Sequence, residues 1–349
     1  MKSLKRSVKR IFNIDMLPGQ SIFLWGARKT GKSTFLKTRF PKSAYFDLLD
    51  SDLYTKWTER PALFREVVLA LPTPLKRRPI IVDEVQRIPE LLNEIHWLIE
   101  NTNTSFILCG SSARKLKTSH ANLLGGRAWR FLFFPFVYPE VPDIDLLHVF
   151  QAGLIPSHYL SPFPHRMLSA YVEDYLYHEI QAEGLVRSLP HFSRFLSSFA
   201  YSNGELTNYA NIARDCGVDA KTVRAYYQIL VDTMLGYFVM PFVPKKGRQV
   251  LSETPKFYLF DVGVSHYLSN TKISALKGPQ AGKAFEHFIL TELVAYRGLN
   301  EKRFDIQFWR TRSGLEVDFI LGNADIAIEV KIADAVQHRD LVGLSHFLE

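Results

Sequence analysis

The octapeptide at residues 26–33 constrains the fold of this 349-residue chain more than any other stretch. It reads Gly-Ala-Arg-Lys-Thr-Gly-Lys-Ser and satisfies the pattern G-x-x-x-x-G-K-[ST] at every fixed position. The apolar run at 21–25 is typical of a buried strand, and residues 34–37 can open a helix. Strand, loop and helix in this order predict an α/β fold built on a parallel sheet.

The residue types at the fixed positions of this loop each suit the binding of a nucleotide phosphate. Gly26 and Gly31 let the backbone turn tightly, so that several N–H groups can point at one phosphate. Lys32 adds a positive charge for the outer phosphates, and Ser33 offers a hydroxyl to Mg²⁺. The helix N-terminus behind the loop also favours an anion. We therefore predict binding of ATP with Mg²⁺. The expected nucleotide-binding residues are Gly26, Ala27, Arg28, Lys29, Thr30, Gly31, Lys32, Ser33 and Thr34.

Two adjacent carboxylates follow a second buried run. Residues 44–48 form a plausible strand, and the apolar residues 79–82 lead directly into Asp83 and Glu84. Asp83 is expected to hold Mg²⁺ through water, and Glu84 to act as the general base on the attacking water. The alternative is a solvated acidic turn, which the upstream phosphate loop disfavours. Residues 85–100 have the spacing of one amphipathic helix.

The next predicted strand, residues 105–110, ends at two serines. A polar side chain there could reach the γ-phosphate or the attacking water, and Ser111 is preferred over Ser112 for this role. A cap on the following helix is an equally good interpretation of either serine.

A glycine pair and an arginine precede the fifth predicted strand at 131–134. Arg127 follows Gly125 and Gly126, where a ring-forming ATPase often places the arginine that reaches a neighbour's γ-phosphate. Arg130 is the alternative for this role. A surface arginine beside a turn remains equally plausible.

Taken together, the motifs resemble a widespread group of prokaryotic AAA-type (AAA+) ATPases. The resemblance is carried by the phosphate loop and by residues 80–86, 109–112, 125–127 and 134–136 in that order. It implies a P-loop NTPase core, then a helical and winged-helix section, then a small α/β module of PD-(D/E)xK, or restriction-endonuclease-like, type. The expected sections are 1–137 for the core, 138–204 for a proline-rich connector and helical section, 205–262 for the winged helix and 278–349 for the nuclease-like module.

The expected winged helix has a capped helix pair and a hairpin. Residues 209–215 and 220–231 read as helices capped by Asn208 and Asp219, and residues 237–243 can pair with 256–260 as the wing. A basic wing tip containing Lys245, Lys246 and Arg248 would suit duplex DNA. The second helix exposes Lys221 and Arg224, beside Tyr226 and Tyr227. Interdomain packing is the other interpretation of this section.

The last section carries a second group of charged residues. A long helix from residue 282 carries Glu286, and strand-like segments at 304–311, 315–321 and 325–332 follow. Glu286, Asp318 and Glu329 are expected to bind a divalent cation, with Lys331 activating water against a phosphodiester. The alternative is a polar sheet face whose charges pair with each other. The resemblance implies further strand and helix beyond Glu349.

Composition adds weaker expectations. Lys and Arg total 43 against 35 Asp and Glu, which suggests a polyanionic partner such as DNA. Cys109 and Cys216 fit no metal-type spacing and favour a reducing compartment. The basic start has Leu4, Val8 and Ile11 at helical spacing but no secretory core, and no apolar run suggests a membrane span. We expect a cytoplasmic protein.

Two functions fit these observations. The first is an oligomeric AAA-type ATPase that couples ATP turnover to DNA binding or processing by its C-terminal half. The second is a nucleotide-dependent switch whose C-terminal half docks a protein partner and has no nuclease activity.

Overall fold

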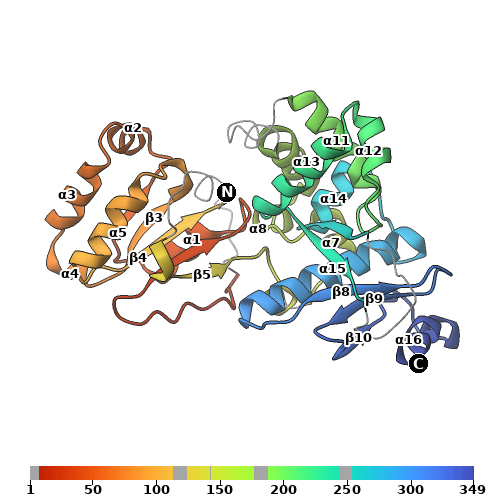
Figure 1. Ribbon diagram of the computed structural model, residues 1–349. Coiled ribbons are helices and arrows are strands. Elements are labelled where there is room, and N and C mark those ends of the chain that lie inside the picture. Colours follow the sequence, from red (N-terminus) through yellow and green to blue (C-terminus); the bar gives the residue numbers. More distant parts are fainter. Residues whose placement is uncertain (1–7, 113–123, 142, 177–187, 244–253) are drawn as a thin grey trace. The chain divides into compact units, whose positions relative to one another are not determined.

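The computed structural model describes residues 8–112, 124–141, 143–176, 188–243 and 254–349 (Figure 1). The chain divides into two compact units. The first unit contains residues 8–135 and 232–234, and the second contains residues 136–231 and 235–349. The first boundary lies close to the predicted end of the ATPase core at residue 137, and the three sections predicted beyond it fall within the second unit except for residues 232–234.

The first unit is built on a five-stranded parallel sheet, as predicted. Its order is β2-β3-β4-β1-β5. The strands are β1 (Ser21–Trp25), β2 (Tyr45–Asp47), β3 (Ile80–Asp83), β4 (Phe106–Gly110) and β5 (Ala128–Leu132). β5 begins before the predicted 131–134, because the pairing with β1 already starts at Ala128, opposite Ser21.

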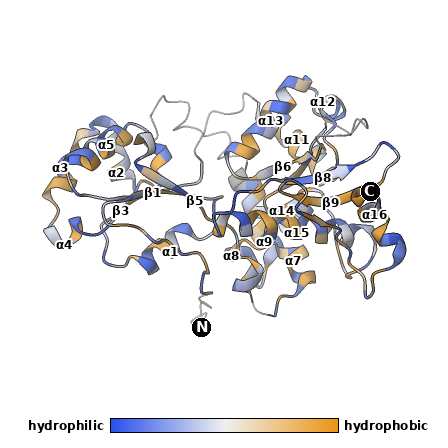
Figure 2. Cartoon of the chain, turned by 60° about the horizontal axis from the view of Figure 1, so that its bottom comes forward, coloured by the Kyte–Doolittle hydropathy of each residue, from blue (hydrophilic) through white to orange (hydrophobic). Residues whose placement is uncertain are grey.

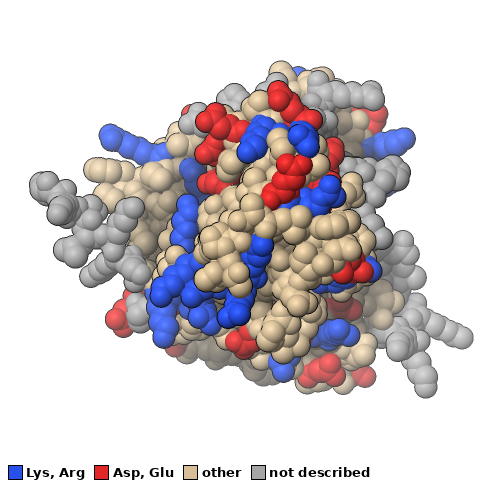
Figure 3. All heavy atoms as spheres, turned by 90° about the vertical axis from the view of Figure 1, so that its left-hand side faces the viewer, with Lys and Arg blue, Asp and Glu red and all other residues tan. Residues whose placement is uncertain are grey.

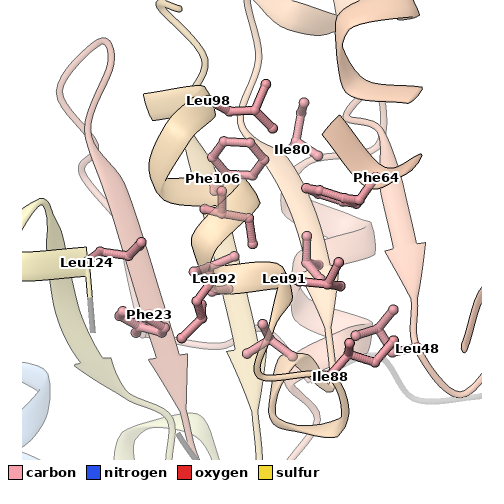
Figure 4. Packing of buried hydrophobic residues seen from close by; sticks show 14 of the residues in the cluster. Phe23, Leu48, Phe64, Ile80, Ile88, Leu91, Leu92, Leu98, Phe106 and Leu124 are labelled. Carbon is pink, nitrogen blue, oxygen red and sulfur yellow. The ribbon is translucent and has the colours of Figure 1, made fainter. Parts of the chain in front are cut away.

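Helices cover both faces of this sheet. They are α1 (Lys32–Arg39), α2 (Ser51–Glu59), α3 (Ala62–Ala70), α4 (Thr73–Lys76), α5 (Leu91–Asn101) and the 3₁₀ turns η1 (Val85–Arg87) and η2 (Leu124–Gly126). Figure 2 shows α1 on the side of the sheet opposite to α2, α3 and α5. Phe64 of α3 and Leu91 and Leu98 of α5 pack toward Phe106 on the strands (Figure 4). Burial on both faces explains why the strands read as continuous apolar runs.

The predicted continuous helix at 85–100 is wrong. The chain adopts a left-handed conformation at Glu84, with φ of 57°, and continues as the short turn η1. Ile88 precedes Pro89 and is extended, because proline disfavours the helical conformation of the residue before it. The main helix, α5, therefore begins only at Leu91.

The helical spacing of Leu4, Val8 and Ile11 predicts an amphipathic helix near the start of the chain. This prediction is wrong for the described residues 8–17, which contain no helix. Phe12 and Ile14 are buried while Ile11 and Asn13 are exposed, which is the alternation of an extended segment. The ring of Phe12 packs edge-on against Phe35 and Phe133. The packing of Phe12 against these rings thus favours an extended backbone over the helix that the local spacing predicts.

The second unit combines helices with a second five-stranded sheet. Its helices are α7 (Leu146–Ala152), α8 (Pro156–Tyr159), α9 (Pro164–Ala170), α11 (Leu189–Tyr201), α12 (Tyr209–Cys216), α13 (Ala220–Asp232), α14 (Val262–Leu268), α15 (Gly278–Leu299) and α16 (Val342–Leu348). Shorter turns are η3 (Tyr138–Glu140), the π-helical η4 (Tyr171–Leu176) and η5 (His338–Leu341). Among the described helices, none has the length and apolar character needed to cross a membrane.

The second sheet has the order β10-β9-β8-β6-β7. Its strands are β6 (Gly236–Pro241), β7 (Lys256–Leu259), β8 (Ile306–Arg310), β9 (Glu316–Leu321) and β10 (Ile326–Ile328). The predicted pairing of 237–243 with 256–260 is confirmed as the antiparallel pair β6–β7. Because β6 also pairs in parallel with β8, the predicted winged-helix and C-terminal sections share one sheet.

The helix pair preceding this sheet forms as predicted. Asn208 caps α12 by accepting a hydrogen bond from the Asn211 amide at 3.0 Å, and Asp219 accepts one from the Thr222 amide at 2.6 Å. Tyr226 and Tyr227, expected beside the exposed cations, are instead buried. The predicted wing-tip residues Lys245, Lys246 and Arg248 lie outside the described residues.

Candidate nucleotide site and a second acidic cluster

Three predicted site segments meet at one edge of the first sheet. Gly26, Glu84 and Ser111 each come directly after a strand, namely β1, β3 and β4. These strands are parallel neighbours, with Trp25 opposite Gly110 and Asp83 opposite Cys109. The carboxyl ends of the strands therefore bring the phosphate loop, the two acids and the serine together, as expected for a ligand site in an α/β sheet.

The glycines of the loop are required by its geometry. Gly31 has φ of 97°, a conformation that favours glycine. At Gly26 a Cβ atom would lie 2.2 Å from the carbonyl oxygen of Phe133. The Lys32 ammonium lies inside the loop, where it donates to the carbonyl oxygens of Gly26 at 2.6 Å and Ala27 at 3.0 Å. The loop is thus a closed turn of backbone around a buried cation.

The residues predicted to hold Mg²⁺ lie beside one another. The Ser33 hydroxyl donates to Oδ2 of Asp83 at 2.6 Å, and Oδ1 of Asp83 accepts from the Glu84 amide at 3.1 Å. Asp83 is buried at the base of the loop. A hydroxyl and a carboxylate next to a phosphate-binding turn are oxygen donors of the kind that Mg²⁺ prefers. These two residues therefore fit the predicted cation.

Tyr45 is a partner of Asp83 that the sequence did not reveal. Its hydroxyl donates to the same Oδ2 atom that accepts from Ser33. Burial, together with the negative charge of Asp83, raises the pKa of Tyr45 far above its usual value, so the phenol remains a donor. Tyr45 reaches Asp83 across neighbouring strands, and no local sequence pattern signals such a contact.

Glu84 and Ser111 are joined by a second unforeseen residue, Gln86. The Gln86 amide nitrogen lies 2.5 Å from Oε2 of Glu84 and 3.1 Å from the Ser111 hydroxyl. The Ser111 hydroxyl is 3.4 Å from the same Glu84 oxygen. All three side chains are buried, as is Ser112. The carboxylate of Glu84 is therefore held in one orientation by Gln86 and Ser111.

Arg127 lies away from these residues. It precedes Ala128, which pairs with Ser21 at the start of β1, and so occupies the edge of the sheet opposite to Gly26. Its guanidinium pairs with Glu100, which lowers the pKa of that carboxyl. Arg130 is exposed on the edge strand β5. Within one chain, Arg127 does not join the nucleotide site.

The surface of the protein carries its charges unevenly. On the face shown in Figure 3, Lys and Arg side chains gather in the lower part, while acidic side chains lie mainly in the upper part. A local group of cations of this kind favours contact with polyanions.

The second predicted group of charged residues gathers around Asp318, which is buried and close enough to Glu286 and Glu329 for their charges to raise its pKa further. Glu286 lies on α15 and Asp318 on β9. β10 ends at Ile328, so the strand predicted at 325–332 is shorter, and Glu329 and Lys331 lie just beyond it. Their side chains form an ion pair with each other. This pairing matches the alternative in which the charges of the sheet compensate one another.

A buried lysine that the sequence interpretation missed stands among these acids. The ammonium of Lys256, at the start of β7, lies 3.1 Å from Oε1 of Glu286 and 2.5 Å from Oε1 of Glu316. The residue is only 4% exposed. The Tyr258 hydroxyl donates to the same Glu286 oxygen at 2.5 Å. In the sequence, Lys256 is simply a polar residue at the start of an apolar strand, which does not reveal its burial.

Asp318 faces two of the other acids. Burial, followed by the negative charges of Glu286 and Glu329, raises the pKa of Asp318 to about 7. Its Oδ2 accepts a hydrogen bond from the Val330 amide at 2.7 Å. Even so, the part of the chain that the structure describes contains no group of three His, Cys, Asp or Glu side chains placed to hold a metal ion. In this arrangement the three described acids are therefore not placed as ligands of one metal ion.

Comparisons with protein families divide the chain in three. Residues 19–141 match the family described as AAA domain. Residues 149–275 match Domain of unknown function (DUF8612), and residues 281–349 match Domain of unknown function (DUF4143). The first unit thus contains an AAA-type ATPase domain, in agreement with the resemblance based on the motifs.

Two curated relatives are Uncharacterized protein Rv2008c of Mycobacterium tuberculosis (strain ATCC 25618 / H37Rv) and Uncharacterized protein Mb2031c of Mycobacterium bovis (strain ATCC BAA-935 / AF2122/97). Each is 23% identical over 246 residues, which is 68% of this chain and 55% of the relative. The chain therefore spans about half the length of the curated relatives it matches.

Two solved structures show a weaker likeness. The Aeropyrum pernix ORC2 protein in its ADP form has 14% identity and a TM-score of 0.33, covering 73% of this chain and 89% of that one. The Aeropyrum pernix ORC1 protein in complex with DNA has 14% identity and a TM-score of 0.25, covering 72% and 86%. With TM-scores this low, we draw no conclusion about the fold of the whole chain from these two structures.

Proposed function

We propose that the protein is a Mg²⁺-dependent ATPase that hydrolyses ATP at the carboxyl edge of its first sheet. The observation that carries this proposal is the 2.6 Å contact between the Ser33 hydroxyl and Oδ2 of Asp83, directly beneath the phosphate loop. Glu84 follows one residue later with its carboxylate fixed by Gln86. Phosphate binding, cation binding and a general base thus lie at one place.

Each side chain then has a role in the reaction. Lys32 and the loop amides bind the phosphate oxygens, and Ser33 and Asp83 hold Mg²⁺, which offsets negative charge on the phosphates. Glu84 accepts a proton from the attacking water, and Gln86 keeps its carboxylate oriented for that transfer. Ser111, hydrogen-bonded to Gln86, assists in positioning the water.

We expect Lys32→Ala to weaken Mg-ATP binding by about 10- to 150-fold, since a hydrogen bond to a charged group contributes roughly 1.5–3 kcal/mol. Titration of the purified chain with a fluorescent ATP analogue measures the effect. The matched control is Lys42→Ala, which removes an exposed lysine. Unchanged affinity in the Lys32 variant would show that the nucleotide does not bind in this loop.

We further propose that turnover drives work on DNA by the second unit. Lys221 and Arg224 are exposed on α13, the second helix of the capped pair, and can contact phosphates. The neighbouring Tyr226 packs 5.1 Å from the ring of Phe192, so the aromatic residues serve the core. The DNA contact of α13 is thus electrostatic, without base stacking.

The double variant Lys221→Glu, Arg224→Glu should bind duplex DNA more weakly and reduce the slope of log affinity against log salt by about 2, because two phosphate contacts are lost. Fluorescence anisotropy across a salt series measures both quantities. The control is Lys302→Glu, Arg303→Glu, two exposed cations of the same unit. An unchanged slope in the α13 variant would exclude this helix as the DNA contact.

The second candidate function is a nucleotide-dependent switch that docks a protein partner. It is favoured by the acidic residues of the second sheet, which pair with Lys256 and Lys331 and do not form a metal set. A wild-type chain without any salt-dependent DNA affinity would support this switch over the DNA-coupled ATPase.

A further inference from the structure

We propose that Lys256 is a built-in counter-ion that replaces a divalent cation in the second unit, so that this unit contains a metal-free charge cluster. The cluster consists of four acids and their cations. The acids are Glu286, Glu316, Asp318 and Glu329, and the cations are Lys256, Arg310 and Lys331. This inference concerns the second unit and is independent of ATP hydrolysis in the first.

Lys256 lies between Glu286, one of the predicted metal ligands, and Glu316. Its ammonium contacts one carboxylate from α15 and one from β9, and its side chain is only 5% exposed. It also lies 5.4 Å from the centre of the Phe308 ring. A buried ammonium is tolerated only when it is paired, and here it has two carboxylate partners.

Each acid of the cluster already has a partner. Glu286 accepts from Lys256 and Tyr258, and Glu316 pairs with Lys256 and, at 3.3 Å, with Arg310. Asp318 accepts from the Val330 amide, and Glu329 pairs with Lys331. A divalent cation would have to displace these contacts and approach ammonium groups that repel it.

Among the described buried oxygens of the cluster, Oε2 of Glu329 has no hydrogen-bond partner. Because Lys331 pairs with the other oxygen of the same carboxylate, a cation at Oε2 would lie close to an ammonium group. An oxygen beside a positive charge is a poor ligand for a divalent cation.

The charge cluster therefore holds elements of the second unit together. Lys256 ties β7 to α15 and to β9, elements that are distant in the sequence. If Lys256 is the counter-ion, its removal leaves the half-buried Glu286 without a cation and leaves Glu316 with Arg310 alone. The second unit of the variant should then be less stable than that of the wild type. Unlike the wild type, the variant should be stabilised by an added divalent cation.

The experiment is thermal unfolding of the full chain without nucleotide, in the presence and absence of Mn²⁺ or Ca²⁺. Any change in Tm that the cation causes in the wild type should be the same in Asp318→Ala, which shows that the cation does not act at Asp318. Lys256→Met should lower the Tm by roughly 5–15 °C, and the added cation should recover part of that loss. Lys256→Met combined with Glu286→Gln should show a smaller loss and a smaller recovery.

A second measurement covers the case in which Lys256→Met fails to fold. Glu286→Gln leaves Lys256 paired with Glu316, so this variant should fold and bind Mn²⁺ no better than the wild type in a calorimetric titration. Two results would overturn the proposal. One is a Tm increase of the wild type with Mn²⁺ that disappears in Asp318→Ala. The other is Mn²⁺-dependent DNA cleavage that is lost in the same variant.

Discussion

Glu84→Gln is expected to lower the steady-state rate of ATP hydrolysis by about 10²- to 10⁴-fold and to leave Mg-ATP binding close to that of the wild type. The carboxamide has nearly the shape of the carboxylate but cannot accept the proton of the attacking water. The loop around Lys32 and the contact between Ser33 and Asp83 do not involve the Glu84 side chain, so phosphate and cation binding persist. A phosphate-release assay and a nucleotide titration separate the two effects.

The matched control is Glu90→Gln, because Glu90 is an exposed acid shortly after Glu84 on the same segment. It should hydrolyse ATP at the wild-type rate. If Glu84→Gln also retained turnover, the base would have to be another group, and the orientation of Glu84 by Gln86 and Ser111 would have no catalytic meaning. Loss of binding together with turnover would instead indicate that the substitution disturbs the buried network.

The nucleotide site could be predicted because its information is local. A phosphate loop needs glycines, a lysine and a hydroxyl at fixed spacing, so Gly26, Gly31, Lys32 and Ser33 are visible in one stretch of sequence. The acids at the end of β3 follow from a second local pattern, an apolar run leading into carboxylates. Parallel pairing then dictates that these stretches share an edge of the sheet.

Features that depend on contacts between distant segments could not be predicted. Lys256 reads as an ordinary polar residue at a strand end, and only the packing of β7 against α15 and β9 shows that it is buried between Glu286 and Glu316. Tyr226 reads as a residue near a DNA-contacting surface, yet its ring fills an aromatic core with Phe192 and Phe195. Side-chain charge and type set the chemistry, whereas tertiary contacts decide which groups meet.

The break at Glu84 shows a third reason. The apolar spacing of residues 85–100 is genuinely helical, but Pro89 forces Ile88 out of the helical conformation, and Glu84 turns with a positive φ. The turn places Gln86 where its amide can hold the Glu84 carboxylate. A periodic pattern therefore gave the correct burial of this segment and the wrong path of its backbone.

Arg127→Ala is expected to lower ATP turnover by about 10³-fold, the lower end of the range for an arginine that offsets charge on the transferred phosphoryl group. Such a role is possible only between chains, because Arg127 lies at the edge of the sheet opposite to Gly26. In the described chain its guanidinium pairs with the exposed Glu100, and exposed pairs are weak enough to be exchanged for a phosphate. The effect therefore requires assembly of several copies, which we propose.

Mixing two inactive variants tests this arrangement directly. Arg127→Ala keeps Glu84, and Glu84→Gln keeps Arg127, so a mixed assembly contains complete sites wherever the second variant presents its arginine to the first. Turnover should therefore rise on mixing, and the rise should depend on total protein concentration. The control is Arg130→Ala, an exposed arginine on the same edge strand, which should keep wild-type activity.

The possible outcomes separate the interpretations of this residue. Recovery on mixing assigns Arg127 to a neighbour's nucleotide site. Full activity of Arg127→Ala alone makes it a surface arginine paired with Glu100, and a loss confined to Arg130→Ala transfers the role to that position. A slow Arg127→Ala variant that no mixture restores contradicts action between chains. It would mean that the ion pair with Glu100 supports the unit itself, since nothing else about Arg127 in the described structure connects it to the phosphate loop of its own chain.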